Sequence, residues 1–412
     1  MNVLFFTIDN VTSFRTRSIY MDLVNKFIRE GHYVTVISVC EKRDQRPDIV
    51  RRIETDGGEV LKVFSPNVTK VSNYIMKGVS LVWLNHLYKK AANQAMKNRL
   101  YDLVLYGSPP VTVYGAVDLV KKKQGSYSYL LLKDIWPYDC LFGDALSTKG
   151  WKGIAFNILK FMARKLYSVS DVIGCMSPAN IKFLTDNEPE IDKDKIEVNP
   201  NSVEPFGVAL SEAEIKETRK KYGIPTDKVI FLYGGNLGIP QGIDFALEAV
   251  KASKIVDDAC FVFVGGGTAK ELVEKAKTTQ NYENLLFIPP MPKDEYDQFV
   301  YACDVGLIFL NHECLSPNYP SRLLSYMQAG LPVLCATDIY TDVGKIAVEN
   351  GYGLNCQSND VGGFVRCVLY MMDNKKRSNM GKKAHDYYIR NYTSDNSYQI
   401  IMNRLLPTTN AR

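Results

Sequence analysis

The sequence predicts an α/β protein with two doubly wound, Rossmann-like domains facing a central cleft. The prediction depends on the pattern of strands, helices and turns and on the length of the chain. Short runs rich in Val, Ile, Leu, Phe and Tyr alternate with helical patterns, and glycine-rich turns follow several of these runs. The 412 residues exceed what one hydrophobic core usually holds. Apolar residues at 46% and charged residues at 23% are ordinary for a globular protein and exclude a disordered or fibrous one.

The first domain is expected over residues 1–202. Its continuous apolar runs are typical of parallel strands buried on both faces. An amphipathic helix over Arg17–Glu30 follows the first of them. The predicted strands are Asn2–Ile8, Tyr33–Val39, Glu59–Phe64, Leu103–Tyr106, Ser128–Leu132 and Asp171–Met176.

The pattern restarts in a second domain, expected over residues 203–393. Its predicted strands are Lys228–Tyr233, Cys260–Val264, Asn284–Ile288, Asp304–Phe309 and Pro332–Ala336. Helices are predicted over Ile243–Ala252, Ala269–Thr278, Lys293–Cys303 and Arg322–Ala329. Residues 394–412 are expected to form a C-terminal helix that packs back on the first domain. Ligands of such sheets bind beyond the carboxyl ends of the strands.

Three motifs of the second domain follow predicted strands. YGGNLGIPQG (233–242) and FVGGGTAKEL (263–272) each join a strand to a helix. Glycines there allow a phosphate close to the backbone, and the helix start offers free N–H groups. Thr268 is expected to cap the second helix. A tight turn without a ligand is an equally good explanation of the first motif taken alone.

The third motif is NYPSRLLSYMQAGLPVLCA (318–336). Pro320 and Ser321 suit the start and cap of a helix. Arg322 would then project from the first turn, where a guanidinium favours a diphosphate.

Together these segments resemble retaining glycosyltransferases of the GT-B fold, glycosyltransferase family 4, and within it the bacterial branch that builds O-antigen and capsular polysaccharide. The resemblance covers most of the chain. It implies that a nucleotide diphosphate donor is bound by the second domain. The implied donor-binding residues are Gly235, Asn236, Leu237, Gly238, Gln241, Gly265, Gly266, Gly267, Met291, His312, Glu313, Tyr319, Ser321, Arg322 and Ser325.

The chain also departs from that family. Many members carry Arg and Lys where this sequence has Asn236 and Gln241, and many carry two Glu where it has Pro317 and Ser325. Arg322 is therefore expected to supply most of the fixed positive charge, together with backbone amides of the first glycine turn.

In the first domain, KDIWPYD (133–139) follows a predicted strand, and the resemblance implies that Asp134 acts as a base or orienting group. A turn or capping aspartate is the alternative. Asp9, Ser13, Arg15 and Arg17 lie in the loop that meets the acceptor in GT-B enzymes, and both arginines suit an acceptor diphosphate. They are equally well explained as solvated charges.

Charge and apolar residues gather in the first domain. Residues 62–165 hold 16 Lys and Arg against 5 Asp and Glu. Two stretches, 79–99 and 151–167, combine basic side chains with Trp, Leu, Ile and Phe, which suits an anionic bilayer. Ordinary domain helices with a core stripe and a solvated face are the alternative. No run approaches the length of a membrane span.

The function expected is transfer of a sugar from a nucleotide diphosphate donor, with UDP as the expected nucleotide, to a lipid-linked or glycan acceptor, with retention. Asp134 and Arg322 are the expected catalytic residues. No metal ion is expected, since the four His form no ligand pattern. No cofactor is expected, because the nucleotide sugar is a substrate. No nucleic acid partner is expected, because the basic residues form no known binding motif. Nine Cys without C-x-x-C spacing indicate a reducing cytoplasm. The two basic, apolar stretches favour the inner face of the cell membrane. The alternatives are a UDP-N-acetylhexosamine 2-epimerase and a non-catalytic nucleotide-sugar-binding subunit of a polysaccharide assembly complex.

Overall fold

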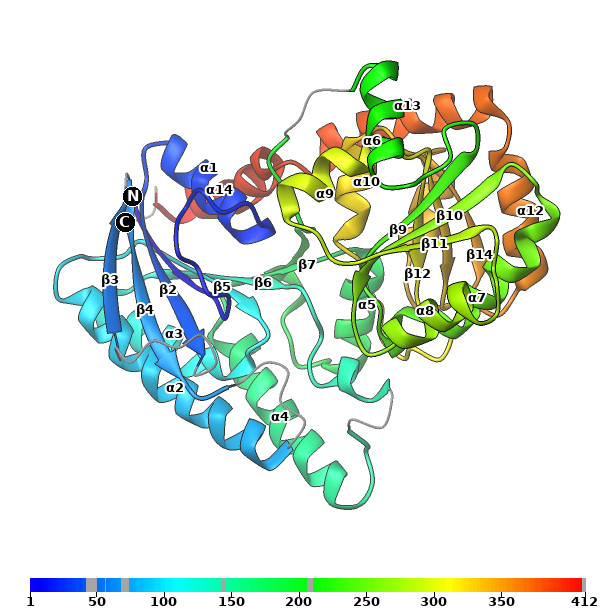
Figure 1. Cartoon of the computed structure of the whole chain (residues 1–412). Coiled ribbons are helices and arrows are strands. Elements are labelled where there is room, and N and C mark those ends of the chain that lie inside the picture. Colours follow the sequence, from blue (N-terminus) through cyan, green and yellow to red (C-terminus); the bar gives the residue numbers. More distant parts are fainter. Residues whose placement is uncertain (42–49, 56, 68–73, 143–145, 206–209, 410–412) are drawn as a thin grey trace. The chain divides into compact units, whose positions relative to one another are not determined.

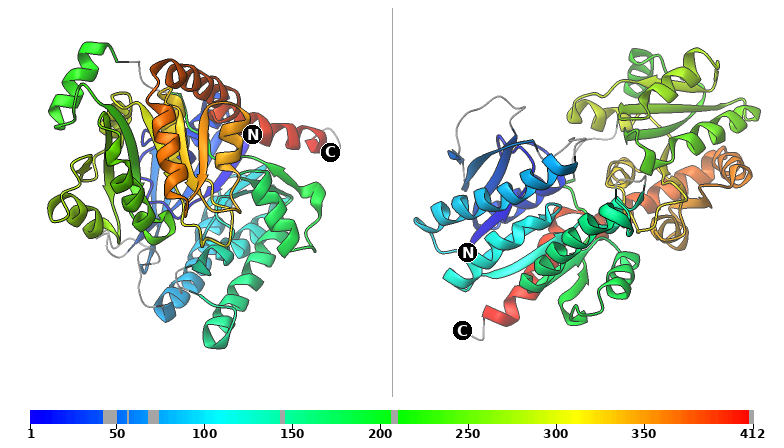
Figure 2. Two further views of the ribbon diagram at one scale, coloured as in Figure 1. Left: turned by 90° about the vertical axis from the view of Figure 1, so that its right-hand side faces the viewer. Right: turned by 90° about the horizontal axis from the view of Figure 1, so that it is seen from below.

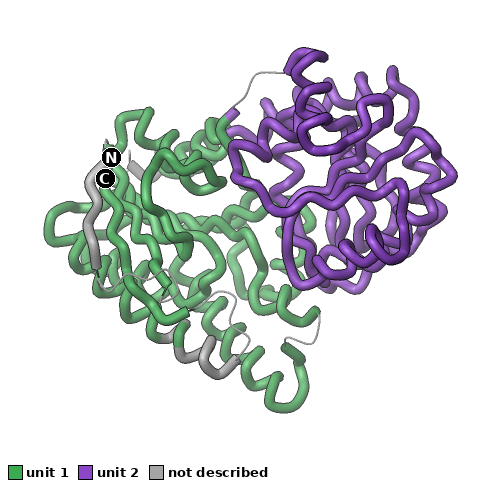
Figure 3. The backbone as a smooth tube through the Cα atoms, in the orientation of Figure 1, with its two compact units in different colours: residues 1–204, 394–412 green, residues 205–393 purple. Residues whose placement is uncertain are grey.

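The computed structural model describes residues 1–41, 50–55, 57–67, 74–142, 146–205 and 210–409 (Figure 1). The chain divides into two compact units (Figure 3). Unit 1 comprises Met1–Glu204 and Ser394–Arg412, and unit 2 comprises Pro205–Thr393. The division falls two residues beyond the domain boundary expected from the sequence.

Unit 1 is built on an eight-stranded sheet in the order β3-β4-β2-β1-β5-β6-β7-β8. All neighbours are parallel except β3 and β4. The strands are β1 (Asn2–Phe6), β2 (Tyr33–Glu41), β3 (Val50–Thr55), β4 (Gly58–Ser65), β5 (Leu103–Ser108), β6 (Tyr127–Leu132), β7 (Val172–Cys175) and β8 (Ile196–Val198). The helices are α1 (Ile19–Arg29), α2 (Tyr74–Met96), α3 (Tyr114–Gln124), α4 (Gly150–Val169), α5 (Pro178–Asn187) and α14 (Ser394–Thr409), with short helical turns that include η3 (Tyr138–Cys140).

Alternate residues of the unit 1 strands build two cores, one on each face of the sheet. Leu4 and Phe6 of β1 belong to the core beneath α2, α3, α4 and α5. Val3 and Phe5 belong to the core beneath α1 and α14. The C-terminal helix α14 thus packs beside α1, where the two ribbons lie together in Figure 1. Burial on both faces explains why these strands read as continuous apolar runs.

Unit 2 is built on a six-stranded parallel sheet in the order β11-β10-β9-β12-β13-β14. The strands are β9 (Val229–Asn236), β10 (Ala259–Gly266), β11 (Leu285–Ile288), β12 (Val305–Phe309), β13 (Val333–Thr337) and β14 (Gly353–Gln357). The helices are α6 (Glu212–Lys221), α7 (Ile243–Ala252), α8 (Lys270–Thr278), α9 (Lys293–Val300), α10 (Arg322–Gln328), α11 (Val343–Glu349), α12 (Val361–Met371) and α13 (Asn374–Asn391). Figure 2 shows helices on both faces of each sheet.

The prediction of two doubly wound α/β domains is confirmed, as two Rossmann-like units. The sequence prediction missed β3, β8 and β14. All three are edge strands, which lack the two buried faces that produce a continuous apolar run. β3 contains Arg51, Arg52 and Glu54, and it is also the antiparallel exception to the predicted parallel series.

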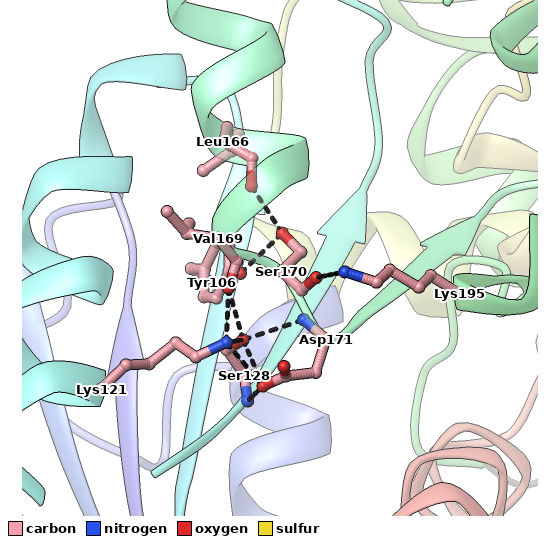
Figure 4. A network of polar contacts seen from close by, with 8 residues as sticks. All are labelled: Tyr106, Lys121, Ser128, Leu166, Val169, Ser170, Asp171 and Lys195. Atoms are coloured by element: carbon pink, nitrogen blue, oxygen red, sulfur yellow. Dashed lines mark hydrogen bonds and ion pairs between the residues drawn. The ribbon is translucent and has the colours of Figure 1, made fainter. Parts of the chain in front are cut away.

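A polar network ties the amino ends of β6 and β7 to the neighbouring helices (Figure 4). The Lys121 ammonium donates to Asp171 Oδ2 at 2.8 Å, to the Val169 carbonyl at 2.7 Å and to Ser128 Oγ at 3.0 Å. Ser128 also donates from its own N–H and hydroxyl to Asp171 Oδ2. The network lies at the sheet edge opposite the carboxyl ends, so we assign it to holding the fold together.

None of the helices in the described part of the chain combines the length and hydropathy that a membrane span requires.

Because of this network, Lys121 should contribute more to the free energy of unfolding than its neighbour Lys122. Lys121→Met should lower the free energy of unfolding by about 1–3 kcal/mol, because the partly buried Asp171 loses its cationic partner. Lys122→Met, which removes only an exposed pair with Asp118, should cost less than about 1 kcal/mol. Urea denaturation of both variants measures the difference, and equal losses would contradict the structural role of the network.

Candidate functional site

Three loops at the carboxyl edge of the unit 2 sheet are joined by backbone hydrogen bonds. The Leu237 N–H, after β9, donates to the Gly266 carbonyl at 2.9 Å. The Ala269 N–H, after β10, donates back to the Leu237 carbonyl at 2.9 Å. The Asn311 N–H, after β12, donates to the Pro240 carbonyl at 2.9 Å. The motifs predicted to share this edge are therefore in contact.

Two glycines of the second motif are required by this loop contact. A Cβ on Gly265 (φ +149°) would lie 1.9 Å from the Gly235 carbonyl oxygen. A Cβ on Gly267 (φ +152°) would lie 2.3 Å from the Leu237 carbonyl oxygen. Both positions combine a backbone conformation that favours glycine with a contact no side chain tolerates. Loop packing alone therefore demands these two glycines, whether or not a phosphate binds.

Arg322, the first residue of α10, lies against the first glycine turn. Its guanidinium carbon is 4.3 Å from the centroid of the Tyr233 ring, a cation–π contact. A Cβ on Gly235 (φ +124°) would be 3.6 Å from the same carbon. Arg322 Nη1 is buried without a hydrogen-bond partner among the described residues. Because buried donors are nearly always paired, this nitrogen has unused hydrogen-bonding capacity.

Three tyrosines contact the first glycine turn. The Gly234 N–H donates to the Tyr326 hydroxyl at 2.9 Å, and the Tyr233 hydroxyl donates to the Asn236 carbonyl at 2.6 Å. A Cβ on Gly234 would lie 1.8 Å from the hydroxyl oxygen of Tyr296. The sequence does not single out Tyr296 and Tyr326, because a tyrosine within an apolar helix pattern is typical of a core residue.

Asn236 and Gln241, the two uncharged residues of the first motif where many family members carry Arg and Lys, bond to each other. Asn236 Nδ2 donates to Gln241 Oε1 at 2.9 Å. A Cβ on Gly238 would lie 2.7 Å from that Nδ2 and 2.8 Å from that Oε1. The positions that hold Arg and Lys in many family members therefore form a neutral bridge across Gly238 and place no charge beside Arg322.

The structure corrects three of the sequence expectations for this edge. Leu237 is fully buried and its N–H is already bonded to Gly266, so that amide is not available to a phosphate. Ser321 is exposed and makes no capping hydrogen bond, because its backbone is already helical. Thr268 does not cap α8, which begins one residue later with Ala269 at the N-cap.

The remaining predicted donor contacts are spread around the edge. Tyr319 is buried, and its hydroxyl is 2.5 Å from that of Tyr392, so its side chain belongs to the interior of unit 2. His312 and Glu313 are exposed after β12, whereas Ser325 of α10 and Met291 before α9 are partly buried.

In unit 1, Asp134 follows β6 at the carboxyl edge of the sheet. Its N–H donates to the Ser108 carbonyl at 3.3 Å, and its carboxylate has no hydrogen bond or ion pair to another described residue. Burial, followed by the negative charge of Asp139, raises the pKa of Asp134 to about 7. Asp9, after β1, and Tyr20 of α1 lie near Asp134. Burial raises the pKa of Tyr20, and the negative charges of Asp9 and Asp134 raise it further.

The two arginines expected at the acceptor have different surroundings. Arg17 donates from Nη2 to the Glu204 carbonyl at 3.3 Å, and Arg29 pairs with the Glu204 carboxylate at 2.5 Å. Arg17 therefore helps to fix the end of unit 1, which the sequence did not foresee. Arg15 is exposed, and its N–H donates to Ser13 Oγ at 3.1 Å. In the described part of the chain no three His, Cys, Asp or Glu side chains gather as a metal site.

Comparisons with known proteins indicate the class of protein. Residues 214–387 match the family model described as Glycosyl transferases group 1. The probable glycosyltransferase WbjE of Pseudomonas aeruginosa is 25% identical over 330 residues, which cover 76% of this chain and 78% of WbjE. The putative colanic acid biosynthesis glycosyl transferase WcaI of Escherichia coli K12 is 25% identical over 248 residues, 60% of each chain.

Solved structures share the fold over the whole chain. Sucrose-phosphate synthase from Thermosynechococcus elongatus gives a TM-score of 0.74 at 12% identity and covers 100% of this chain and 99% of its own. HepE from Anabaena, in complex with UDP, gives 0.68 at 13% identity and covers 99% and 100%. The fold is that of the GT-B glycosyltransferases. The protein is a glycosyltransferase, and the match to the group 1 model is confined to residues 214–387.

The raised pKa of Asp134 predicts the pH dependence of a transfer reaction in which Asp134 is the base. kcat/KM should rise with pH through a pKa near 7, because only the carboxylate accepts a proton. Asp134→Asn should abolish this rise and lower kcat/KM about 10²–10⁴-fold.

Asp139→Asn is the matched variant, since it removes a neighbouring negative charge and should move the rise to lower pH. A pH profile that Asp134→Asn leaves unchanged would show that Asp134 is not the base.

Proposed function

We propose that this protein transfers a sugar from a nucleotide diphosphate donor, with UDP as the nucleotide, to a lipid-linked or glycan acceptor, with retention of anomeric configuration, in the synthesis of a bacterial surface polysaccharide. The names of WbjE and WcaI support the class of reaction and the process, and the UDP complex of HepE supports the nucleotide. The sugar nucleotide is a substrate, and the reaction as proposed uses no cofactor or metal ion.

The observation that carries the proposal is the unpartnered Nη1 of Arg322 beside Gly235. A diphosphate held there would give this buried donor an anionic partner. In the transfer reaction the same guanidinium would stabilise the charge that develops on the leaving diphosphate. Because Asn236 and Gln241 bond to each other and carry no charge, the electrostatic contribution of Arg322 should be large.

Arg322 should therefore dominate the affinity for UDP. Arg322→Ala should weaken UDP binding about 10–100-fold, since a charge-assisted bond to phosphate is worth about 1.5–3 kcal/mol. Arg322→Lys should retain part of the affinity, because it keeps the charge and loses the forked geometry. Calorimetric titration with UDP, GDP and ADP measures this and identifies the base.

Arg366→Ala, which removes an exposed arginine of unit 2, is the control and should bind UDP like the wild type. If UDP binds the wild type and Arg322→Ala equally, the donor site is not at Arg322. NMR analysis of the product tests retention, and an epimerised donor formed without acceptor would favour an epimerase instead.

We also propose that α4 lies on an anionic membrane at the cytoplasmic face, which would bring unit 1 to a lipid-linked acceptor. Four large apolar side chains of α4 are exposed at helical spacing: Trp151 (65%), Ile154 (65%), Ile158 (51%) and Phe161 (58%). They share one face of the helix, while the opposite face packs in the core. Lys165 lies over the Phe161 ring at 5.3 Å. α4 contains no acidic residue, as expected of a helix on anionic lipid.

Not every basic residue of this stretch is available to lipid. Lys160 and Arg164 pair with the buried carboxylate of Glu188 at 3.5 and 2.6 Å. Phe156, expected among the membrane anchors, is buried in the unit 1 core. The support for membrane contact therefore comes from the exposed stripe more than from the charge of the segment.

Flotation with vesicles of anionic phospholipid tests the stripe. The wild type should float, and the variant with Ser at positions 151, 154, 158 and 161 should lose at least about tenfold in binding, because each fully buried apolar side chain is worth about 1.5–3 kcal/mol. A control with Ser at Leu100 and Ile255, two exposed apolar residues elsewhere, should float like the wild type. Equal flotation of both variants would contradict membrane contact through α4.

A further inference from the structure

Arg322 differs from the other arginines of unit 2, because no carboxylate or carbonyl among the described residues pairs with its guanidinium. Arg219 and Arg366 pair with carboxylates, and Arg377 and Arg390 donate to backbone carbonyls. A carboxylate would hold the Arg322 guanidinium in place, but it would also cancel the charge that attracts a diphosphate. A guanidinium that keeps its full charge for a ligand has to be held by uncharged groups.

The ring of Tyr233, directly before the first glycine turn, is such an uncharged group. The guanidinium carbon of Arg322 lies 4.3 Å from the centroid of this ring. An aromatic ring attracts a cation through its quadrupole, so the contact leaves the charge of the guanidinium uncancelled. Tyr233 is fully buried, and burial raises the pKa of its hydroxyl, so the ring stays neutral.

The Tyr233 ring is itself fixed on the sheet. Its hydroxyl donates to the Asn236 carbonyl at 2.6 Å, which ties the ring to the glycine turn. Phe263 of β10 and Phe309 of β12 contact it from the two neighbouring strands, with ring centroids 5.1 and 5.9 Å away. The ring therefore offers the guanidinium a rigid surface.

The glycine turn and the start of α10 are also held together. Arg322 and Tyr326 are four residues apart on α10 and so share one face of the helix. The Gly234 N–H donates to the Tyr326 hydroxyl at 2.9 Å, and a Cβ on Gly235 would lie 3.6 Å from the guanidinium carbon. The helix start is thus fixed beside the turn, and the Tyr233 ring defines where the guanidinium at that start lies.

We infer that Tyr233 is a positioning residue for the transfer reaction: its ring holds the Arg322 guanidinium at the glycine turn without neutralising it, and so places Nη1 for the diphosphate before the donor binds. The inference rests on the proposed function, because it assigns a role within that same donor site. In this role Tyr233 touches no substrate and acts only through Arg322. Loss of the ring should therefore weaken diphosphate binding, whereas loss of its hydroxyl alone should not.

Calorimetric titration of the whole protein with UDP tests this role. Tyr233→Leu should weaken UDP binding about 3–10-fold, because the guanidinium keeps its charge and loses its fixed position. Tyr233→Phe should stay within about twofold of the wild type, since the ring remains. Phe231→Leu, which removes another fully buried ring of β9 from the same core, is the matched control and should bind UDP like the wild type. The affinity for uridine, which has no phosphate, should be the same in all of these proteins.

A double-mutant cycle separates positioning from a general loss of packing. In the Arg322→Ala background, Tyr233→Leu should cause no further loss of UDP affinity, because no guanidinium is left to position. A further loss of the same size in that background would overturn the inference. UDP affinity that Tyr233→Leu leaves unchanged in the wild-type background would overturn it as well.

The position of the guanidinium can also be observed without a ligand. In protein with isotope-labelled arginine, the side-chain N–H signal of Arg322, assigned by its loss in Arg322→Lys, should show the ring-current shift of a group over an aromatic face. Tyr233→Phe should keep this shift and Tyr233→Leu should abolish it. An unchanged signal in Tyr233→Leu would show that the ring does not hold the guanidinium. Failure of UDP to bind the wild type would count against the donor site, and the shift would still test the contact with Tyr233.

Discussion

The contact between the loops that follow β9 and β10 is the constraint on which the candidate donor site depends. The reciprocal bonds of Leu237 with Gly266 and Ala269 bring the two backbones so close that Gly265 and Gly267 cannot carry side chains. This contact holds the first glycine turn against the start of α10. The guanidinium of Arg322 consequently lies over Tyr233 with one donor unpaired. A rigid backbone is what an electrostatic site requires, since donors that are already positioned need no reorganisation when charge develops.

In unit 1 the two ends of β6 differ in how their charged side chains are paired. Lys121 and Asp171 satisfy each other at the amino ends of β6 and β7. Lys133 and Asp134, at the other end of β6, have no bonded side-chain partner among the described residues, and burial moves their pKa values toward each other. Groups with perturbed pKa values and spare bonding capacity are characteristic of functional sites. The amino end of β6 therefore stabilises the fold, and its carboxyl end holds the candidate functional groups.

The sequence predicted the class of fold because continuous apolar runs follow directly from burial on both faces of a parallel sheet. It could not predict β3, β8 or β14, edge strands in which polar residues interrupt the apolar run, whereas the edge strand β11 keeps such a run and was predicted. At the site, the sequence indicated Arg322 and the glycine turns, because two glycine-rich turns followed by an arginine at a helix start are typical of a diphosphate site. Tyr296, Tyr326 and the Asn236–Gln241 bridge were not, because ordinary residues acquire these roles only through contacts across the sheet edge. Arg17 is the opposite case: the sequence indicated an acceptor contact, whereas in the fold its guanidinium donates to the Glu204 carbonyl.

What the sequence by itself determined is the alternation of strands and helices, the order of the glycine-rich motifs and the basic character of the first domain, since each is a property of neighbouring residues. The tertiary structure alone decided which charges are satisfied. Lys160 and Arg164 pair with Glu188, and Arg17 bonds to the Glu204 carbonyl. Nη1 of Arg322 and the side chain of Lys133 have no bonded partner in the described chain. The physical reason is that pairing depends on distances of a few ångströms between groups remote along the chain, and no local pattern records those distances.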